Sequence, residues 1–186
     1  MIFRSVAQAW HDAYQDVFIT KSRLEPRIRS TASCDFKEIY SAELAKVKSK
    51  IERLHKPLYD IGMYTFAPSD QIDNSARRNI ESLIWSLFVK SVGSDFFYSI
   101  TETQRAITLC QYALVEARYR LLSGGKHKYS QRELGHALGL VHTSYARKWK
   151  KIFEKMVGIY LELANDALIE VSSVVEKVNA SYKEVA

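Results

Sequence analysis

The stretch of sequence that decides the fold is YSQRELGHALGLVHTSYARKW, residues 129–149. Ser130 is followed three residues later by Glu133, a capping-box pattern that predicts the start of a helix. Gly139 is expected to supply a tight turn in which φ is positive. Together these features predict a helix-turn-helix over residues 130–156.

The two halves of this motif differ in how closely they follow the usual spacing. Gly135 lies where the two helices are expected to cross closely, so a small side chain is required. Thr143 or Ser144 is expected to cap the second helix. Lys148 then occupies a position that is normally apolar, and Trp149 is expected to take over its role in the core. We therefore expect a turn one residue longer than usual. The expected buried positions are Leu134, Leu138, Leu140, Tyr145, Trp149, Ile152, Phe153 and Met156.

Positive charge is concentrated around this motif. The whole chain of 186 residues carries a formal net charge of +6. Residues 118–155 alone contain ten basic and two acidic residues, a net of +8, so the rest of the chain carries −2. A basic excess confined to one window is expected when one surface meets a polyanion such as nucleic acid.

The expected ligand of this surface is double-stranded DNA. An α-helix fits the major groove, and the residues at its N-terminal end lie nearest the base edges. Lysine and arginine side chains around it would contact phosphates, which supply affinity but no sequence information. The residues expected to read bases are His142, Thr143, Ser144 and Arg147. The residues expected to contact phosphates are Lys126, Lys128, Arg132, Lys148, Lys150, Lys151 and Lys155.

The N-terminal region, residues 1–56, is expected to form two helices. Apolar residues at helical spacing predict the first over residues 3–19, and the polar, basic stretch 20–33 is expected to be a linker. Asp35 is expected to cap the second helix, which runs to about Leu54. Its apolar seam either packs within the fold or forms a dimer contact, as in a short coiled coil. The seam consists of Phe36, Tyr40, Leu44, Val47, Ile51 and Leu54.

The rest of the chain is also expected to be helical. Pro57 is expected to end the preceding helix, and residues 57–74 to form an ordered connector. Residues 75–186 are expected to form a helical domain, with one helix from Ser75 to Val92 and another beginning at Thr101 as its cap. The predicted fold class is all-α, a multi-helix globular domain containing the helix-turn-helix and carrying an N-terminal helical extension.

Several classes of protein are disfavoured by the sequence. No run approaches the roughly 18–20 apolar residues of a membrane span, and the N-terminus lacks a signal-peptide layout. We therefore expect a cytoplasmic protein that does not bind membranes. Cys34 and Cys110 are too few for a disulfide framework, and Cys110 is expected to be a small core residue. The chain has no catalytic motif or metal-ligand spacing, so we expect no enzyme, catalytic residue, metal or cofactor.

Three segments resemble one class of lambdoid-phage Q antitermination proteins. They are Ser75-Ala-Arg-Arg-Asn, Leu109-Cys-Gln-Tyr-Ala, and the segment from Tyr129 to Lys150 with its Tyr-Ala-Arg-Lys-Trp helix. The likeness extends over about residues 70–175, whereas the N-terminal third resembles no family.

The resemblance implies a regulator of late phage transcription in a bacterial host cell. Such proteins bind DNA near the late promoter, engage paused RNA polymerase and then travel with it past terminators. Here the DNA-reading role would fall on His142, Thr143, Ser144, Arg147, Lys148 and Lys151. RNA polymerase would be met by the N-terminal helices or by the acidic C-terminal helix.

Two other functions remain open at this point. One is an ordinary dimeric helix-turn-helix repressor or activator, with the seam of residues 35–54 as its dimer contact. Such a homodimer needs a palindromic site with half-sites about one helical turn apart. The other is a structural or partner-binding helical protein whose basic face is merely solvated.

Overall fold

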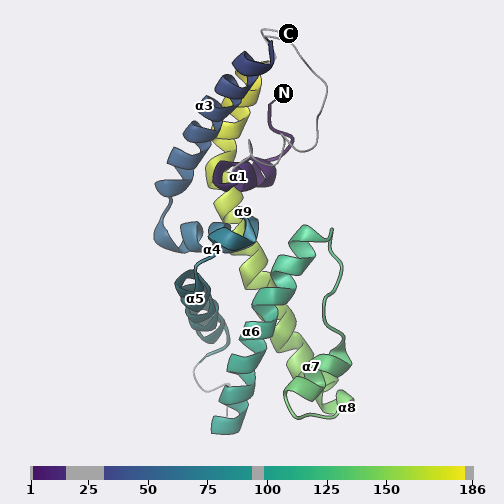
Figure 1. Ribbon diagram of the computed structural model, residues 1–186. Coiled ribbons are helices and arrows are strands. Elements are labelled where there is room, and N and C mark those ends of the chain that lie inside the picture. The colour runs from purple at the N-terminus through teal and green to yellow at the C-terminus, as the bar shows by residue number, and fades with distance from the viewer. Residues whose placement is uncertain (1, 16–31, 94–98, 183–186) are drawn as a thin grey trace. The chain divides into compact units, whose positions relative to one another are not determined.

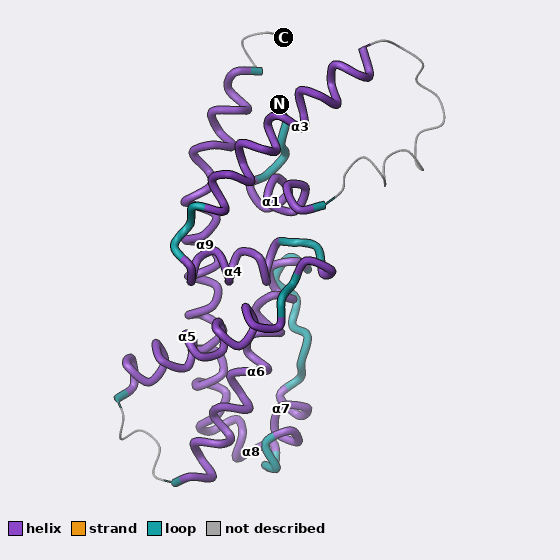
Figure 2. Tube along the Cα trace, turned by 60° about the vertical axis from the view of Figure 1, so that its left-hand side comes forward, coloured by secondary structure: helices purple, strands orange, loops and turns teal. Residues whose placement is uncertain are grey.

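The computed structural model describes residues 2–15, 32–93 and 99–182, and for residues 32–37 it describes the backbone alone. This part of the chain consists of helices joined by turns and loops, and no strand occurs in it (Figures 1 and 2). The prediction of an all-α fold is therefore confirmed. No helix within the described ranges is long and apolar enough to cross a membrane.

The chain divides into two compact units. Unit 1 contains residues 1–76 and 165–186, and unit 2 contains residues 77–164. The division differs from the one expected from sequence, which assigned everything from residue 75 onward to a single domain. The difference arises because the last helix, α9 (Lys150–Ser181), begins in unit 2 and ends in unit 1.

Unit 1 is held together by contacts between the two ends of the chain. α1 (Val6–Tyr14) begins at Ser5, whose hydroxyl accepts a hydrogen bond from the N–H of Gln8 at 3.1 Å. Just before it, the N–H groups of Ile2 and Phe3 both donate to Asn179 Oδ1 on α9, each at 2.9 Å. Asn179 Nδ2 donates in return to the Phe3 carbonyl at 2.9 Å. These bonds explain why residues from 165 onward belong with the N-terminal region.

α3 (Ala32–Glu52) carries the predicted apolar seam. Tyr40, Leu44, Val47 and Ile51 are each at most 8% exposed, so the seam packs within unit 1. The first of the two alternatives is thus confirmed for these four residues, whereas Leu54 is half-buried and the side chain of Phe36 lies outside the described residues. Asp35 lies inside this helix, so the prediction that it caps the helix is wrong. Most of the expected linker at 20–33, and residues 16–19 of the first expected helix, lie outside the described residues.

The expected connector is largely helical, contrary to the prediction. α4 (Lys56–Phe66) places Pro57 in its first turn, where the missing N–H has no intrahelical partner to lose. Proline therefore begins a helix here instead of only ending the previous one. Gly62 is needed because a Cβ at that position would lie 2.1 Å from the Trp10 ring. After α4, a short 3₁₀ turn, η1 (Ser69–Gln71), leads to α5.

Unit 2 contains α5 (Asn74–Val92, apart from its first residues) and α6 (Ile100–Leu122). The cap of α6 is Ser99, whose hydroxyl accepts from the Glu102 N–H at 3.2 Å, and not Thr101 as expected. Ser99 and Thr101 each begin a capping pattern in this stretch, and the helix begins with the one at Ser99. Cys110 is buried on α6 and free, as expected for a core residue.

Candidate nucleic-acid interface

The first helix of the predicted motif is α7 (Gln131–Ala137), and it begins with the expected capping box. The N–H of Glu133 donates to Ser130 Oγ at 3.2 Å, and the N–H of Ser130 donates to Glu133 Oε2 at 2.7 Å. Two N–H groups that a helix start leaves unpaired are thereby satisfied. Leu134 and Leu138 are buried, as predicted.

A tight glycine turn follows α7. Gly139 has a φ of +64°, the left-handed conformation that glycine adopts without steric cost. The N–H of Leu140 returns to the Gly135 carbonyl at 2.9 Å. A Cβ on Gly135 would lie 3.3 Å from the Leu140 carbonyl oxygen and 3.5 Å from Tyr145 Cβ. The predicted roles of both glycines are confirmed.

The second helix begins earlier than the sequence indicated. α8 (His142–Ser144) starts after Val141, which occupies the N-cap position and makes no side-chain cap hydrogen bond. The prediction that Thr143 or Ser144 is the cap is therefore wrong. We refer to residues 130–149, from the capping box through α8 and the turn that follows it, as the α7–α8 pair.

The irregular spacing of the motif is absorbed inside the second helix and not in the turn. Residues Tyr145–Trp149 form a π-helical turn, η3, in which the N–H of Lys150 donates to the Tyr145 carbonyl five residues back. A turn of this kind accommodates one residue more than an α-helical turn. Tyr145 and Trp149 are both buried, at 1% and 4% exposure, so Trp149 does take the core position. The expected longer turn between the helices is absent.

The four residues expected to read bases share one stretch of surface. All of them are exposed on α8 and on the π-helical turn: His142, Thr143, Ser144 and Arg147.

Six of the seven residues expected to contact phosphates are also exposed: Lys126, Lys128, Arg132, Lys150, Lys151 and Lys155. Lys155 additionally donates to the Ser91 carbonyl at 3.3 Å. Lys148 is the exception, because its Nζ lies 2.6 Å from Glu102 Oε1 and 5.7 Å from the centre of the Trp149 ring. Its charge is therefore compensated within unit 2.

A buried carboxylate that the sequence analysis did not single out organises the approach to α7. Glu116, on α6, is fully buried and accepts hydrogen bonds from Arg120 Nε at 2.7 Å and His127 Nδ1 at 3.0 Å. The N–H groups of Lys128 and Tyr129 also donate to it, at 2.9 and 3.1 Å. The loop before α7 is thus fixed to α6. The four-residue spacing of Glu116 and Arg120 was the available signal.

The same cluster connects α6 to α9. Arg120 directs its other two guanidinium nitrogens at the carboxylate of Glu154, at 2.8 and 3.0 Å. Burial alone would raise the pKa of Glu116, but the hydrogen bonds from Arg120, from two backbone N–H groups and from His127 hold it below its ordinary value. The hydrogen bond from Arg120 likewise lowers the pKa of Glu154. Both carboxylates are therefore stabilised in their charged form.

A second contact fixes the other end of α7. Arg105, also on α6, donates through Nε to the Leu138 carbonyl at 3.0 Å. That carbonyl lies at the end of α7, where helical carbonyls lack intrahelical partners. α7 is therefore bound to α6 at both ends, and these contacts fix the position of α7 relative to α6.

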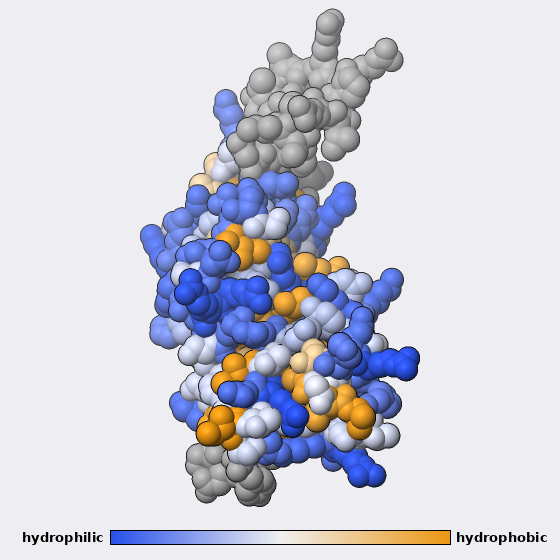
Figure 3. Space-filling model, turned by 60° about the horizontal axis from the view of Figure 1, so that its bottom comes forward, coloured by the Kyte–Doolittle hydropathy of each residue, from blue (hydrophilic) through white to orange (hydrophobic). Residues whose placement is uncertain are grey.

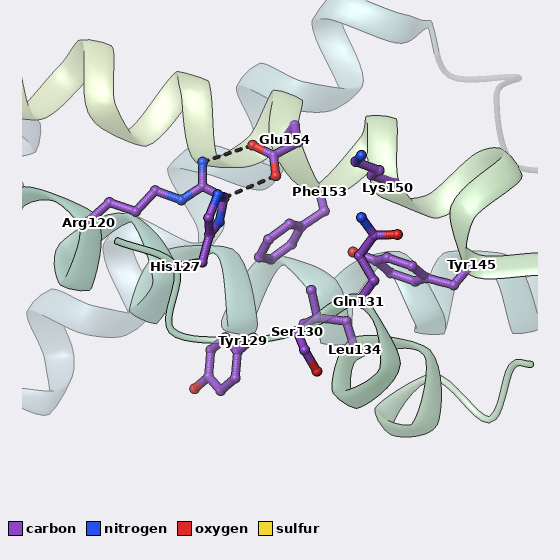
Figure 4. A pocket seen from close by; sticks show the side chains of 10 residues that line it. All are labelled: Arg120, His127, Tyr129, Ser130, Gln131, Leu134, Tyr145, Lys150, Phe153 and Glu154. Carbon is purple, nitrogen blue, oxygen red and sulfur yellow. Dashed lines mark hydrogen bonds and ion pairs between the residues drawn. The ribbon is translucent and has the colours of Figure 1, made fainter. Parts of the chain in front are cut away.

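A groove of about 590 Å³ opens between the loop, α7 and the start of α9 (Figure 4). Its apolar lining comes from Leu134, Tyr145 and Phe153, and Lys150 lies on its rim. The dashed lines in Figure 4 show Arg120 and Glu154 paired at one end. Within the described residues, no three His, Cys, Asp or Glu side chains converge to form a metal site.

The surface that Figure 3 brings forward is mixed in character. Strongly hydrophilic residues cover most of it, and small groups of apolar residues are dispersed among them. Among the large apolar residues exposed on the α7–α8 pair is Val141, at 69%.

Comparisons of the chain with family models, with curated proteins and with solved structures each returned no match.

Proposed function

We propose that this protein is a sequence-specific DNA-binding regulator of transcription and that it acts by binding, not by catalysis. In this proposal the α7–α8 pair is a helix-turn-helix. The observation that carries it is the combination of a short capped helix, a glycine turn and a second helix whose first residues are polar and exposed.

The geometry suits entry into the major groove. That groove is about 12 Å wide and admits one α-helix. On α8, the exposed side chains of His142, Thr143 and Ser144 offer donors and acceptors for base edges, and Arg147 follows on the π-helical turn. Because η3 buries Tyr145 and Trp149, the α8 end of the helix is anchored while its polar residues stay accessible.

The distribution of charge supports the same reading. Most of the predicted phosphate contacts are exposed lysines or arginines that flank α7 and α8, whereas Lys148 and Arg120 are neutralised by carboxylates. Residues 126–155 nevertheless expose seven cationic side chains: Lys126, Lys128, Arg132, Arg147, Lys150, Lys151 and Lys155. Such groups provide the non-specific, salt-dependent part of DNA affinity.

Within this class, we propose that the protein is a phage late-gene antiterminator that associates with bacterial RNA polymerase in the host cytoplasm. The support is the resemblance described for residues 70–175. The alternative is a dimeric repressor or activator. It is less well supported, because the seam on α3 that would form its zipper is already buried within unit 1.

Binding of DNA can be tested with a charge-reversal variant and a matched control. Arg147→Glu with Lys151→Glu should weaken binding to double-stranded DNA at least a hundredfold in fluorescence anisotropy. The control, Arg53→Glu with Lys177→Glu, makes the same change in net charge at exposed positions of unit 1 and should leave binding within about twofold. Equal effects of the two variants would contradict the assignment of the interface.

The role in transcription needs a separate assay. Purified bacterial RNA polymerase is started from a template with a promoter, a downstream terminator and the DNA element selected by the protein. Antitermination predicts full-length transcript only when the element and the protein are both present. A change in initiation without read-through would instead support the repressor or activator.

A further inference from the structure

The fold does not explain why residue 141 is a valine. It is the N-cap of α8, where serine, threonine, aspartate or asparagine stabilises a helix by accepting a hydrogen bond from an N–H of the first turn. Valine cannot accept this bond, and none is made. Helix stability would therefore favour a capping residue over valine at position 141.

Packing does not explain Val141 either. Its side chain is 69% exposed, whereas Leu138 and Tyr145 on either side of it are buried. An exposed valine at a capping position loses the capping bond without gaining much burial. A residue that violates local preferences without a structural gain is expected at a functional site.

We propose that Val141 is a specificity-determining residue whose methyl groups contact the C5-methyl group of a thymine in the major groove. This inference rests on the proposed function. The thymine methyl is the apolar feature that a base pair presents in the major groove, and apolar side chains recognise it. Val141 directly precedes His142, Thr143 and Ser144, so it lies at the end of the second helix that would approach the bases.

The C5-methyl group can be removed without changing base pairing, which makes the proposal testable. A binding site is first selected from random double-stranded DNA with the full-length protein. Each thymine of the selected duplex is then replaced in turn by uracil, which lacks only this methyl group. Affinity is measured by fluorescence anisotropy for the wild type, for Val141→Ser, and for Ile169→Ser as a control at an exposed apolar residue of unit 1.

At one or two positions, replacement of thymine by uracil should weaken DNA binding by the wild type about fourfold, the effect of one buried methyl-sized group. Val141→Ser should be insensitive at those positions, and Ile169→Ser should behave as the wild type. Since serine can cap α8, Val141→Ser should also unfold at a higher temperature than the wild type, which separates specificity from stability.

Three results would overturn the proposal in distinguishable ways. If no DNA sequence is enriched, the proposed function is wrong and the role of Val141 falls with it. If a site is selected but it lacks thymine, or the wild type tolerates uracil at every position, only the role of Val141 is refuted. The same holds if Val141→Ser and the wild type respond identically to each substitution.

Discussion

The guanidinium Nε of Arg120 lies 2.7 Å from the carboxylate of Glu116, which is fully buried in unit 2. Arg120 is also paired with Glu154, so one arginine bridges α6 and α9. The same carboxylate receives the N–H groups of Lys128 and Tyr129. The conformation of the loop that leads into α7 therefore depends on the charged carboxylate that α6 supplies.

Replacing Glu116 should destabilise unit 2 and change its response to acid. Glu116→Gln leaves buried donors without a charged acceptor, and we expect it to lower the free energy of unfolding by about 3 kcal/mol. Urea denaturation followed by circular dichroism measures this loss. Glu162→Gln, at an exposed position, removes the same charge and should have little effect.

The pH dependence of this loss has a definite sign. The pKa of Glu116 is lower in the folded protein than its ordinary value of 4.5, so the folded state favours the charged carboxylate. Its stabilising contribution is present above pH 4.5 and is lost as the pH falls from there through the folded pKa. Wild-type stability should therefore drop more steeply in this acidic range than that of Glu116→Gln. Parallel curves would contradict the assignment.

One substitution should have opposite effects at two helical glycines. Gly62→Ala places a methyl group 2.1 Å from Trp10, and we expect it to lower the free energy of unfolding by about 2 kcal/mol. Gly158→Ala meets no atom within 4 Å and should raise it by about 1 kcal/mol through helix propensity. Denaturant unfolding of the two variants tests the pair, and a stabilised Gly62→Ala would refute the packing of Trp10 on α4.

The turn between α7 and α8 should be sensitive to side chains at Gly139. Its φ of +64° costs an ordinary L-residue roughly 1–2 kcal/mol, and asparagine less. Gly139→Val should therefore lower the thermal unfolding temperature and DNA affinity together. Gly139→Asn should retain most of both. If the two variants lose affinity equally, the backbone conformation is not the cause.

Lys148 and Lys151 should differ in their contribution to DNA binding. Each lysine that contacts a phosphate adds about 0.9 to the slope of log affinity against log salt concentration. Lys151→Ala should reduce this slope by about that amount, whereas Lys148→Ala should leave it unchanged because Lys148 is paired with Glu102. Equal reductions would show that Lys148 leaves Glu102 when DNA binds.

The features that sequence predicted well are those whose cause is local. The capping box at Ser130, the positive φ of Gly139 and the close approach at Gly135 each follow from a few neighbouring residues. The seam on α3 was also predicted, because helical periodicity identifies a buried face. The residues of unit 1 that pack against this seam could not be derived in the same way.

The features that sequence missed depend on contacts or on competing local signals. Pro57 is compatible with either the end of one helix or the first turn of the next, and the burial of α4 decides between them. Glu116 acts on residues that are 11 to 13 positions away, beyond the range of helical spacing rules. The assignment of residues 165–186 to unit 1 depends on contacts such as that between Asn179 and Phe3.

The π-helical turn at Tyr145–Trp149 has a consequence for how this surface can evolve. Insertion or deletion of one residue there would rotate the side chains of α8 by about 100° relative to those of α9, since an α-helix has 3.6 residues per turn. The helix would remain continuous, and its downstream core residues could keep their places. A single codon gained or lost could thus turn a different set of side chains outward, a larger step than any point substitution allows.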